Sequence, residues 1–341
     1  MYPIEQTIEE QVKAFCAWIG KDPLLVQGAG GNVSWKDGDT LWVKASGTWL
    51  ADATEKDIFV PVDLPYLRAS IENGDFTVTP KVLGETGLRP SIETLLHALM
   101  PHRIAVHLHA IEILAHLVRN NCQTDLQSLI DESIHWAMVD YYKPGAALAA
   151  AVSVALTQSA NVDVLFLKNH GVVIGGTNIE EIHSVLNQLI TILSTQPNPI
   201  INSKEIAPIV LNGGQQYIPV DIPGIHDLTF KPNYFNRLNI DWALYPDHVV
   251  FLGPIPACYD SVKLLMVDLS NNNLPELIFL KEQGVFTKPG ISSAKLAQLK
   301  CYYDLMVRQS NHTRLKSLNE QQIAELLNWD AEHFRQNIAK Q

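Results

Sequence analysis

The spacing of apolar residues along the chain predicts a mixture of helices and short strands. Apolar side chains recur at helical spacing over residues 7–19, after a threonine able to cap the helix, and again over residues 178–193. Apolar and polar residues alternate over residues 39–46 as in a half-buried strand, and the Asp-Gly pair at 37–38 predicts a hairpin before it. Further helices are expected over residues 91–100 and 111–120, and further strands over residues 103–110 and 162–176. Short strands mixed with long helices indicate a layered α/β or α+β domain.

The second half of the chain follows a polar stretch rich in proline and asparagine at residues 194–203. Such a stretch is typical of a boundary, so we expect one domain over residues 1–198 and a second over residues 199–341. Two helices are expected to close the second domain. Three runs before them are strand-like: HVVFLGP (248–254), VKLLMVDLS (262–270) and ELIFLKEQGVF (276–286).

Two segments of the chain resemble each other. Leu165–Val172 and Ile278–Val285 share Phe, Leu, Lys, Gly and Val in register, and each is followed by a turn and a helix. This similarity suggests that the second half is a diverged copy of the core of the first, in which Asn169-His170 has become Glu282-Gln283. A chance match between two buried strands is the alternative.

Composition and charge narrow the class of protein. The chain has 341 residues, 47% of them hydrophobic and 18% charged, which is ordinary for a globular protein. Its formal net charge of −11 argues against a nucleic-acid partner, since such proteins need a basic surface. The N-terminus lacks the basic and apolar regions of a signal peptide, and no apolar run approaches the roughly 20 residues that span a bilayer. The four cysteines are scattered, as in a reducing compartment, so a cytoplasmic protein without a membrane partner is expected.

Three histidines suggest a metal site. His107 and His109 are two residues apart on an expected strand, so both imidazoles project from one face and can reach one ion. Two ordinary half-buried histidines are the alternative for this pair alone. His170 lies at a strand end beside a glycine that permits a sharp turn, a position that often carries function. Three histidines with an open fourth position match a catalytic divalent site, and nitrogen ligands favour zinc.

Glu93 lies near the start of the expected helix over residues 91–100. It reads most simply as an acid that complements the helix dipole, but a carboxylate fixed there could also act as a general base. His97 lies four residues further on and faces the same side, and we interpret it as structural.

The glycine-rich stretch QGAGGNVSW looks at first like a dinucleotide-binding loop. That fingerprint requires a third glycine and a following helix. Here the last position is Val33, and a hairpin follows, so the dinucleotide interpretation fails. A backbone cradle for an anion is the remaining interpretation, with donors from Asn32, Ser34, Ser46 and Gly47.

Together these residues resemble a known family, the class II aldolase/adducin superfamily, over roughly residues 11–190. Five motifs occur in the family's order: Gly31-Asn32-x-Ser34, Ser46-Gly47, Pro90-Ser91-x-Glu93, His107-x-His109 and Asn169-His170-Gly171. Three stretches look most similar to the aldolase half of bifunctional rhamnulose-phosphate aldolase/alcohol dehydrogenases: DTLWVKASGT, RPSIETLLHALMPH and YYKPG. In those proteins a second segment follows, to which YPDHVVFLG and LKEQGVF correspond.

The resemblance implies an α/β/α sandwich around a mostly antiparallel sheet, followed here by a smaller α/β segment. It implies a homo-oligomer, a tetramer in the family, with active sites at subunit interfaces. His107, His109 and His170 would bind Zn²⁺ or another divalent transition metal. Glu93 would move a proton at the carbon beside the substrate carbonyl, while the metal stabilises an enediolate.

The resemblance also implies a substrate site. Tyr141 could protonate or orient the aldehyde half of the substrate. Ile92 stands where the aldolases commonly carry a second hydroxyl residue, so the anion could be a phosphate or a carboxylate, and Arg89 and Lys44 could supply charge. The residues expected to hold the substrate anion are Asn32, Ser46, Gly47 and Ser91.

The leading hypothesis is therefore a zinc-dependent lyase of carbohydrate metabolism that cleaves a sugar phosphate or related hydroxy-ketone by a retro-aldol reaction. A sugar-phosphate 4-epimerase, or a decarboxylase of a keto-sugar-acid phosphate, would use the same site. A non-catalytic, adducin-like interaction module is the alternative from another class. The three histidines and Glu93 favour catalysis.

Overall fold

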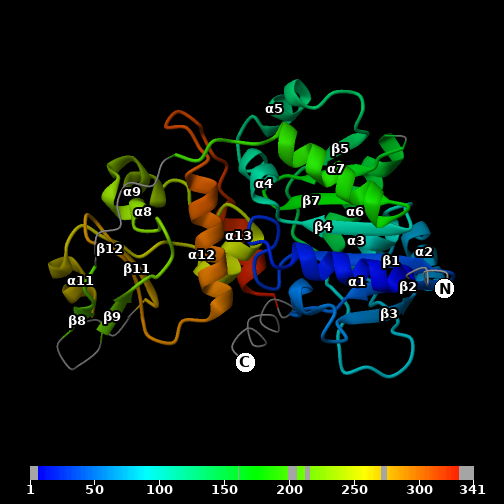
Figure 1. Cartoon of the computed structure of the whole chain (residues 1–341), viewed down its shortest axis with the longest axis horizontal. Coiled ribbons are helices and arrows are strands. Elements are labelled where there is room, and N and C mark those ends of the chain that lie inside the picture. The colour runs from blue at the N-terminus through cyan, green and yellow to red at the C-terminus, as the bar shows by residue number, and fades with distance from the viewer. Residues whose placement is uncertain (1–6, 160, 199–205, 212–215, 270–274, 330–341) are drawn as a thin grey trace, which may run out of the picture.

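The computed structural model describes residues 7–159, 161–198, 206–211, 216–269 and 275–329. Figure 1 shows a larger sheet with its helices in one part of the molecule and a smaller sheet in the other. Helix α12 (Ser293–Met306) runs between the two parts.

The larger sheet has the strand order β3-β2-β1-β4-β7-β6-β5. All neighbouring strands are antiparallel except β5 and β6, which are parallel. β4 is central, and all five of its residues are buried. The strands are β1 Asn32–Asp37, β2 Thr40–Lys44, β3 Phe59–Asp63, β4 Ile104–Leu108, β5 Trp136–Val139, β6 Val164–Leu167 and β7 Gly171–Gly176.

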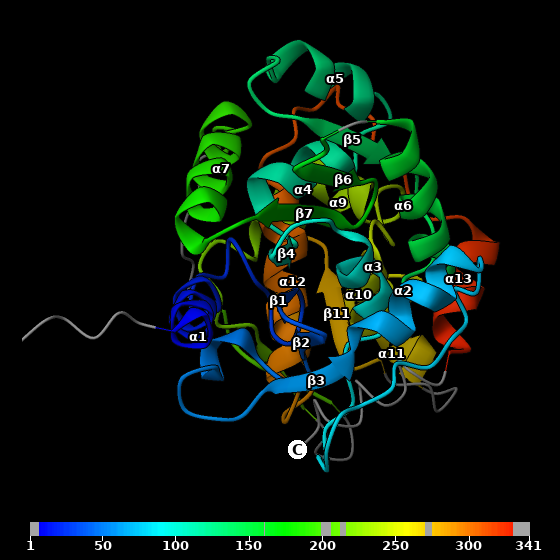
Figure 2. The same cartoon turned by 90° about the vertical axis from the view of Figure 1, so that its right-hand side faces the viewer.

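Helices cover both faces of this sheet (Figure 2). Helices α1, α4 and α7 share one apolar cluster with one face of the strands, and helices α2, α3 and α6 pack against the other face. The structure therefore confirms the expected helical layers on both sides of a mostly antiparallel sheet. The helices of this part are α1 Ile8–Ile19, α2 Leu64–Glu72, α3 Thr94–Leu99, α4 Ile111–Leu117, α5 Cys122–Leu129, α6 Ala146–Gln158 and α7 Ile179–Ile192, with a 3₁₀ turn at Leu50–Asp52.

Local sequence signals explain where the first elements begin. The Thr7 hydroxyl accepts a hydrogen bond from the Glu10 backbone N–H, and the Glu10 carboxylate accepts one from Thr7, which makes a capping box for α1. The β1–β2 hairpin turns at the expected Asp-Gly pair, where Gly38 adopts a φ of +57°.

The smaller sheet has the strand order β10-β11-β12-β9-β8. It contains β8 Ile209–Val210, β9 Gln216–Pro219, β10 Cys258–Tyr259, β11 Leu277–Leu280 and β12 Gly284–Thr287. The accompanying helices are α8 Asp227–Phe230, α9 Pro232–Leu238, α10 Pro246–Leu252, α11 Val262–Leu269, α12 and α13 Glu320–Leu327. A second, smaller α/β segment is therefore present, and two helices close the described part of the chain, as expected.

The two sheets share a pattern of strand pairing. The order β10-β11-β12-β9-β8 has the same succession of one parallel and three antiparallel pairs as β5-β6-β7-β4-β1. A helix joins the parallel strands in each case. The tight turn that follows holds a non-glycine residue with positive φ, Asn169 at 54° and Glu282 at 57°.

Two of the three strand-like runs are in fact helices. HVVFLGP lies largely in α10, and residues 262–269 of VKLLMVDLS form α11, so both strand expectations are wrong, whereas ELIFLKEQGVF forms β11 and β12. Pro246 occupies the first turn of α10, where its fixed φ suits a helix. Both runs are short and apolar without alternation, and periodicity cannot distinguish a buried helix from a buried strand in such a run.

The apolar core joins the two parts of the chain. One cluster contains Val12 and Leu108 from the first part and Val249 and Leu305 from the second. Residues 199–203 of the expected boundary lie outside the described residues, so the division into two domains stays a prediction.

The sequence predicts unpaired cysteines and no membrane-spanning segment. All four cysteines are free thiols, and three of them are buried. Among the helices of the described ranges, none combines the length and the apolarity needed to cross a bilayer.

His248 of α10 is fully buried, and its ring lies 4.3 Å from that of Trp242 and 4.9 Å from that of Tyr302 between ring centroids. Burial lowers the pKa of His248 to about 3. The His248 imidazole takes up a proton near pH 6.5 in the unfolded chain but only near pH 3 in the folded chain. The free energy of unfolding therefore has its full value above about pH 6.5 and decreases as the pH falls below it.

We therefore expect His248→Asn to make the loss of stability between about pH 6 and pH 4 shallower by about 1.4 kcal/mol per pH unit. In the wild-type protein, His248 Nδ1 accepts a hydrogen bond of 3.4 Å from the Leu244 backbone N–H, and the asparagine side chain also offers an acceptor for this donor. Urea unfolding at a series of pH values, with a chelator present, measures the slope. An unchanged slope would contradict the prediction.

Candidate metal centre

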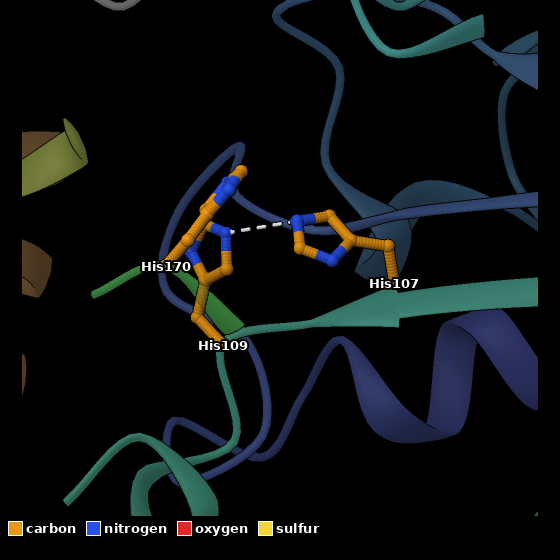
Figure 3. A group of neighbouring side chains, drawn as sticks. All are labelled: His107, His109 and His170. Carbon is orange, nitrogen blue, oxygen red and sulfur yellow. Dashed lines mark hydrogen bonds between the residues drawn. The ribbon is translucent and has the colours of Figure 1, made fainter. Parts of the chain in front are cut away.

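Three buried imidazoles come together at the end of β4 (Figure 3). His107 lies on β4, His109 follows just beyond its last residue, and His170 lies in the turn between β6 and β7. One nitrogen of each ring lies within 4.8 Å of a nitrogen of the others. The structure thus brings together all three histidines that the sequence singled out.

Hydrogen bonding fixes which nitrogen of His107 faces this group. The Val172 carbonyl accepts a bond of 3.0 Å from His107 Nδ1, so Nδ1 carries the proton and Nε2 keeps its lone pair. His107 Nε2 lies 3.2 Å from His109 Nε2. Burial lowers the pKa of His109 to about 3, which makes this imidazole neutral at pH 7, the form that binds a metal.

The turn that carries His170 is held by the second part of the chain. Asn169 has a φ of 54°, a conformation that asparagine tolerates better than most residues. Its side-chain amide donates to the Leu244 carbonyl at 2.8 Å and to the Lys316 carbonyl at 2.6 Å. These two bonds anchor the residue immediately before His170.

Two glycines allow the close packing around the histidines. A Cβ at Gly171 would lie 2.4 Å from the Leu108 carbonyl oxygen and 3.0–3.1 Å from carbon atoms of the His107 and His109 rings. Gly31 has a φ of +64°, and a Cβ there would lie 2.8 Å from the His107 carbonyl oxygen. Only glycine fits at either position without displacement of β4.

Glu93 points at the histidines from the start of α3. Its Oε1 lies 3.5 Å from His170 Nε2 and its Oε2 lies 3.6 Å from His107 Nε2. Its side chain makes no capping hydrogen bond to α3. Burial acts to raise the pKa of Glu93, but His107, His170 and a bond from Asn32 outweigh it and lower the pKa to about 2.

A chain of hydrogen bonds holds Glu93 in place. The Asn32 amide donates to Glu93 Oε2 at 2.9 Å, and the Asn32 amide oxygen accepts from His97 Nε2. His97 Nδ1 then accepts from the Ser34 hydroxyl at 2.7 Å. Burial lowers the pKa of His97 to about 3, so it stays neutral. His97 is structural, as expected, but it acts on the candidate catalytic carboxylate through Asn32.

Strand register brings Asn32 to this position. Asn32 of β1 pairs with His107 of β4, and Leu108 of β4 pairs with Val172 of β7. A residue expected to bind an anion and a residue of the three-histidine group therefore lie side by side on neighbouring strands of one sheet.

The two serine motifs meet through a single β-bridge between Ala45 and Pro90. This bridge extends β2 and places Ser46-Gly47 beside Ser91. Gly47 has a φ of +80°. The backbone there turns toward the same space as the Ser91 side chain.

A cavity opens over this group, and the empty space in and above it, open solvent included, is about 410 Å³. It contains all four residues expected to hold an anion, together with Glu93 and two of the histidines. The lining residues are Ala29, Gly31, Asn32, Lys44, Ser46, Gly47, Ser91, Ile92, Glu93, His109, Pro144, His170, Pro246 and Asp247.

Positive charge in the cavity comes from Lys44. Its side chain is buried, and its ammonium donates to the Ala29 and Ala45 carbonyls at 3.3 Å each. Arg89 is exposed and is not a lining residue of this cavity. Ile92 does line it, at the position where a second hydroxyl was expected.

Tyr141 is half-buried and packs against the main apolar cluster. It is not among the residues that line the cavity, although Pro144 of the same segment is. Its catalytic role therefore stays a prediction.

Sequence reasoning missed Asp247, which lies in the first turn of α10. Its carboxylate oxygen Oδ2 is 3.5 Å from His109 Nδ1. The stretch around it was interpreted as strand-like, and no local motif links it to the histidines.

Comparison with known proteins gives a family. The model of the class II aldolase and adducin N-terminal domain matches residues 10–196, more than half of the chain. A curated Bacillus subtilis protein named uncharacterized oxidoreductase YuxG is 25% identical over 218 residues. That match covers 59% of this chain and only 30% of the relative's length.

Solved structures are similar to more than half of the chain. The N-terminal class II aldolase domain of a conserved protein from Thermoplasma acidophilum is 23% identical, with a TM-score of 0.47, and the match covers 57% of this chain and 94% of that domain. A sugar-phosphate aldolase from Thermotoga maritima is 17% identical, with a TM-score of 0.43, over 55% of this chain and 91% of that protein.

The crowding at Gly171 leads to a prediction. We expect Gly171→Ala to destabilise the fold by about 1–3 kcal/mol or more, because the Leu108 carbonyl must move, and to weaken metal binding through His107 and His109. Gly87→Ala is the matched control, since its Cβ would meet no atom within 4 Å and its φ is not positive. Thermal unfolding and metal content of both variants measure the effects. Equal behaviour of the two variants would contradict the argument.

Proposed function

Because the chain belongs to the family of class II aldolase and adducin N-terminal domains, we propose that it is a metal-dependent aldolase-type carbon–carbon lyase. The observation that carries this proposal is the buried group of His107, His109 and His170 with Glu93 beside it, at the floor of a cavity. A non-catalytic interaction module has no use for such a costly arrangement of buried polar groups.

The donor set fits a divalent transition metal. The three imidazoles are buried and close together, and at least His107 turns its unprotonated nitrogen toward the group. Glu93 Oε1 is buried and has no hydrogen-bond partner in the described part of the chain. Three nitrogen ligands with an open fourth position are typical of catalytic zinc, so Zn²⁺ is the proposed cofactor.

When bound, the metal would polarise the carbonyl and hydroxyl oxygens of the substrate and stabilise the enediolate that carbon–carbon cleavage produces. Glu93 would carry the proton at the carbon beside the carbonyl. Its lowered pKa keeps it ionised at pH 7, the form in which a carboxylate can accept a proton. Asn32 holds its Oε2, which leaves Oε1 directed toward His170 and the cavity.

The same cavity would hold the substrate anion. The proposed donors are Asn32, Ser46, Gly47 and Ser91, and the buried Lys44 supplies a positive charge to the same cavity. The proposed substrate is a sugar phosphate or a related hydroxy-ketone. Since Ile92 offers no hydroxyl, Lys44 compensates for that missing donor.

Several finer assignments belong to the same proposal. Tyr141 would assist at the aldehyde half of the substrate. The protein would be a cytoplasmic homo-oligomer, a tetramer by family resemblance. The similarity to bifunctional rhamnulose-phosphate aldolase/alcohol dehydrogenases and the activity of the whole protein remain proposals.

We also infer that the second part of the chain is a diverged copy of the first. The shared strand order and the matching positive-φ turns at Asn169 and Glu282 support this inference. Gln283 follows Glu282 as His170 follows Asn169, so the copy lacks this ligand.

We expect the purified protein to hold about one divalent ion per chain, and His107→Ala to lose it, because the ion would lose one of its three nitrogen ligands. Elemental analysis after dialysis measures the content. His135→Ala is the control, since His135 is exposed and lies outside the cavity lining. Unchanged metal content in His107→Ala would overturn the metal assignment.

Glu93→Gln should keep the metal and lose the cleavage of substrate by a factor of about 10²–10⁴, the usual contribution of a general base. Screening of aldehydes with dihydroxyacetone phosphate, in the synthetic direction, measures the activity. If the wild-type protein epimerises or decarboxylates a sugar phosphate and cleaves none, the lyase proposal is replaced by that activity. Full activity in Glu93→Gln would contradict the role of Glu93.

A further inference from the structure

The second part of the chain brings a carboxylate to the metal centre. Asp247 lies in the first turn of α10, which Pro246 helps to start, and both residues line the cavity. Asp247 is 2% exposed, and its Oδ2 lies 3.5 Å from His109 Nδ1. Asp247 lies outside residues 10–196, the part of the chain that matches the family.

His109 needs a partner of this kind. Its Nε2 lies 3.2 Å from His107 Nε2, within the three-histidine group, so its Nδ1 points away from that group. This Nδ1 is buried and has no hydrogen-bond partner among the residues that the structure describes. When a histidine binds a metal through one nitrogen, the other carries a proton that an oxygen acceptor usually holds.

We propose that Asp247 is a positioning residue of the metal centre, whose carboxylate accepts the Nδ1 proton of His109 and leaves Nε2 to the metal. This inference rests on the proposed function, because it assumes that the three-histidine group binds a metal.

The surroundings of Asp247 fix its carboxylate at this place. Gln298 of α12, itself 2% exposed, donates from Nε2 to Asp247 Oδ2 at 3.5 Å. On the other side, a Cβ at Gly30 would lie 3.2 Å from both Asp247 Oδ2 and His109 Nδ1, so the loop backbone closes over the pair. Both neighbours limit the carboxylate to the side of His109.

The same short segment also supports a second ligand. The Leu244 carbonyl, three residues before Asp247, accepts from the Asn169 amide next to His170. Leu244 thus holds the residue before His170, and Asp247 lies beside His109. The metal centre therefore depends on both parts of the chain.

The test compares the Zn²⁺ affinity of the full chain and its variants by competition with a chelator. Asp247→Ala removes the acceptor and should weaken Zn²⁺ binding about 10–100-fold, the usual effect of losing such a partner. Asp247→Asn keeps an amide oxygen that can accept the Nδ1 proton and should lose less. Asp260→Asn is the matched control: Asp260 is exposed, pairs with Lys281 and carries the same charge in the same part of the chain, so its removal should leave the affinity unchanged.

A second measurement tests the role of Asp247 even if the Asp247→Ala variant does not fold. Nitrogen-15 NMR of the imidazoles of the Zn²⁺-loaded wild-type protein should show His109 with a proton on Nδ1. In Asp247→Asn that proton signal should shift, while the signal of His107 stays in place.

The outcomes separate the two proposals. A wild-type protein that binds no Zn²⁺ contradicts the proposed function. A wild-type protein that binds Zn²⁺ with His109 unprotonated at Nδ1, or an Asp247→Ala variant with wild-type affinity, overturns the role of Asp247 alone.

Discussion

Three imidazoles and a carboxylate are buried together in this protein, and each would lose its hydration on folding. Burial of polar groups is unfavourable unless each finds a partner, so the group requires a rigid frame that supplies partners. Pairing of β4 with β1 and β7 provides it: β1 places Asn32 across from His107, and β7 supplies the Val172 carbonyl to His107 Nδ1. A divalent metal ion could bind the nitrogen lone pairs that these bonds leave free.

The second part of the chain packs against the first part and helps to hold the histidine group. Its core is continuous with that of the first part, and its backbone carbonyls at Leu244 and Lys316 hold the turn of His170. A family resemblance confined to the first part therefore describes the site incompletely.

Much of this could be read from the sequence, because some signals are local. The capping box at Thr7, the Asp-Gly hairpin and the two-residue spacing of His107 and His109 depend on neighbours in the chain, and all gave the observed local structure. The gathering of His170 and Glu93 with this pair followed from the motif resemblance.

The remainder depends on contacts between distant residues. HVVFLGP is apolar without a period, and its helical form is decided by packing on all sides of α10, six of whose residues are buried. Asp247 was missed because its contact with His109 joins residues that are distant in the sequence. The contact of His97 with Asn32 likewise depends on the packing of α3 beside β1. The position of Tyr141 outside the cavity lining likewise depends on how its segment packs.

The central claim is that these three histidines form one metal site. X-ray absorption at the zinc edge of the loaded protein tests it most directly. The structure predicts three imidazole nitrogens at about 2.0–2.1 Å, with oxygen ligands completing the coordination. A sulfur ligand at about 2.3 Å, or a site with a single imidazole, would contradict it.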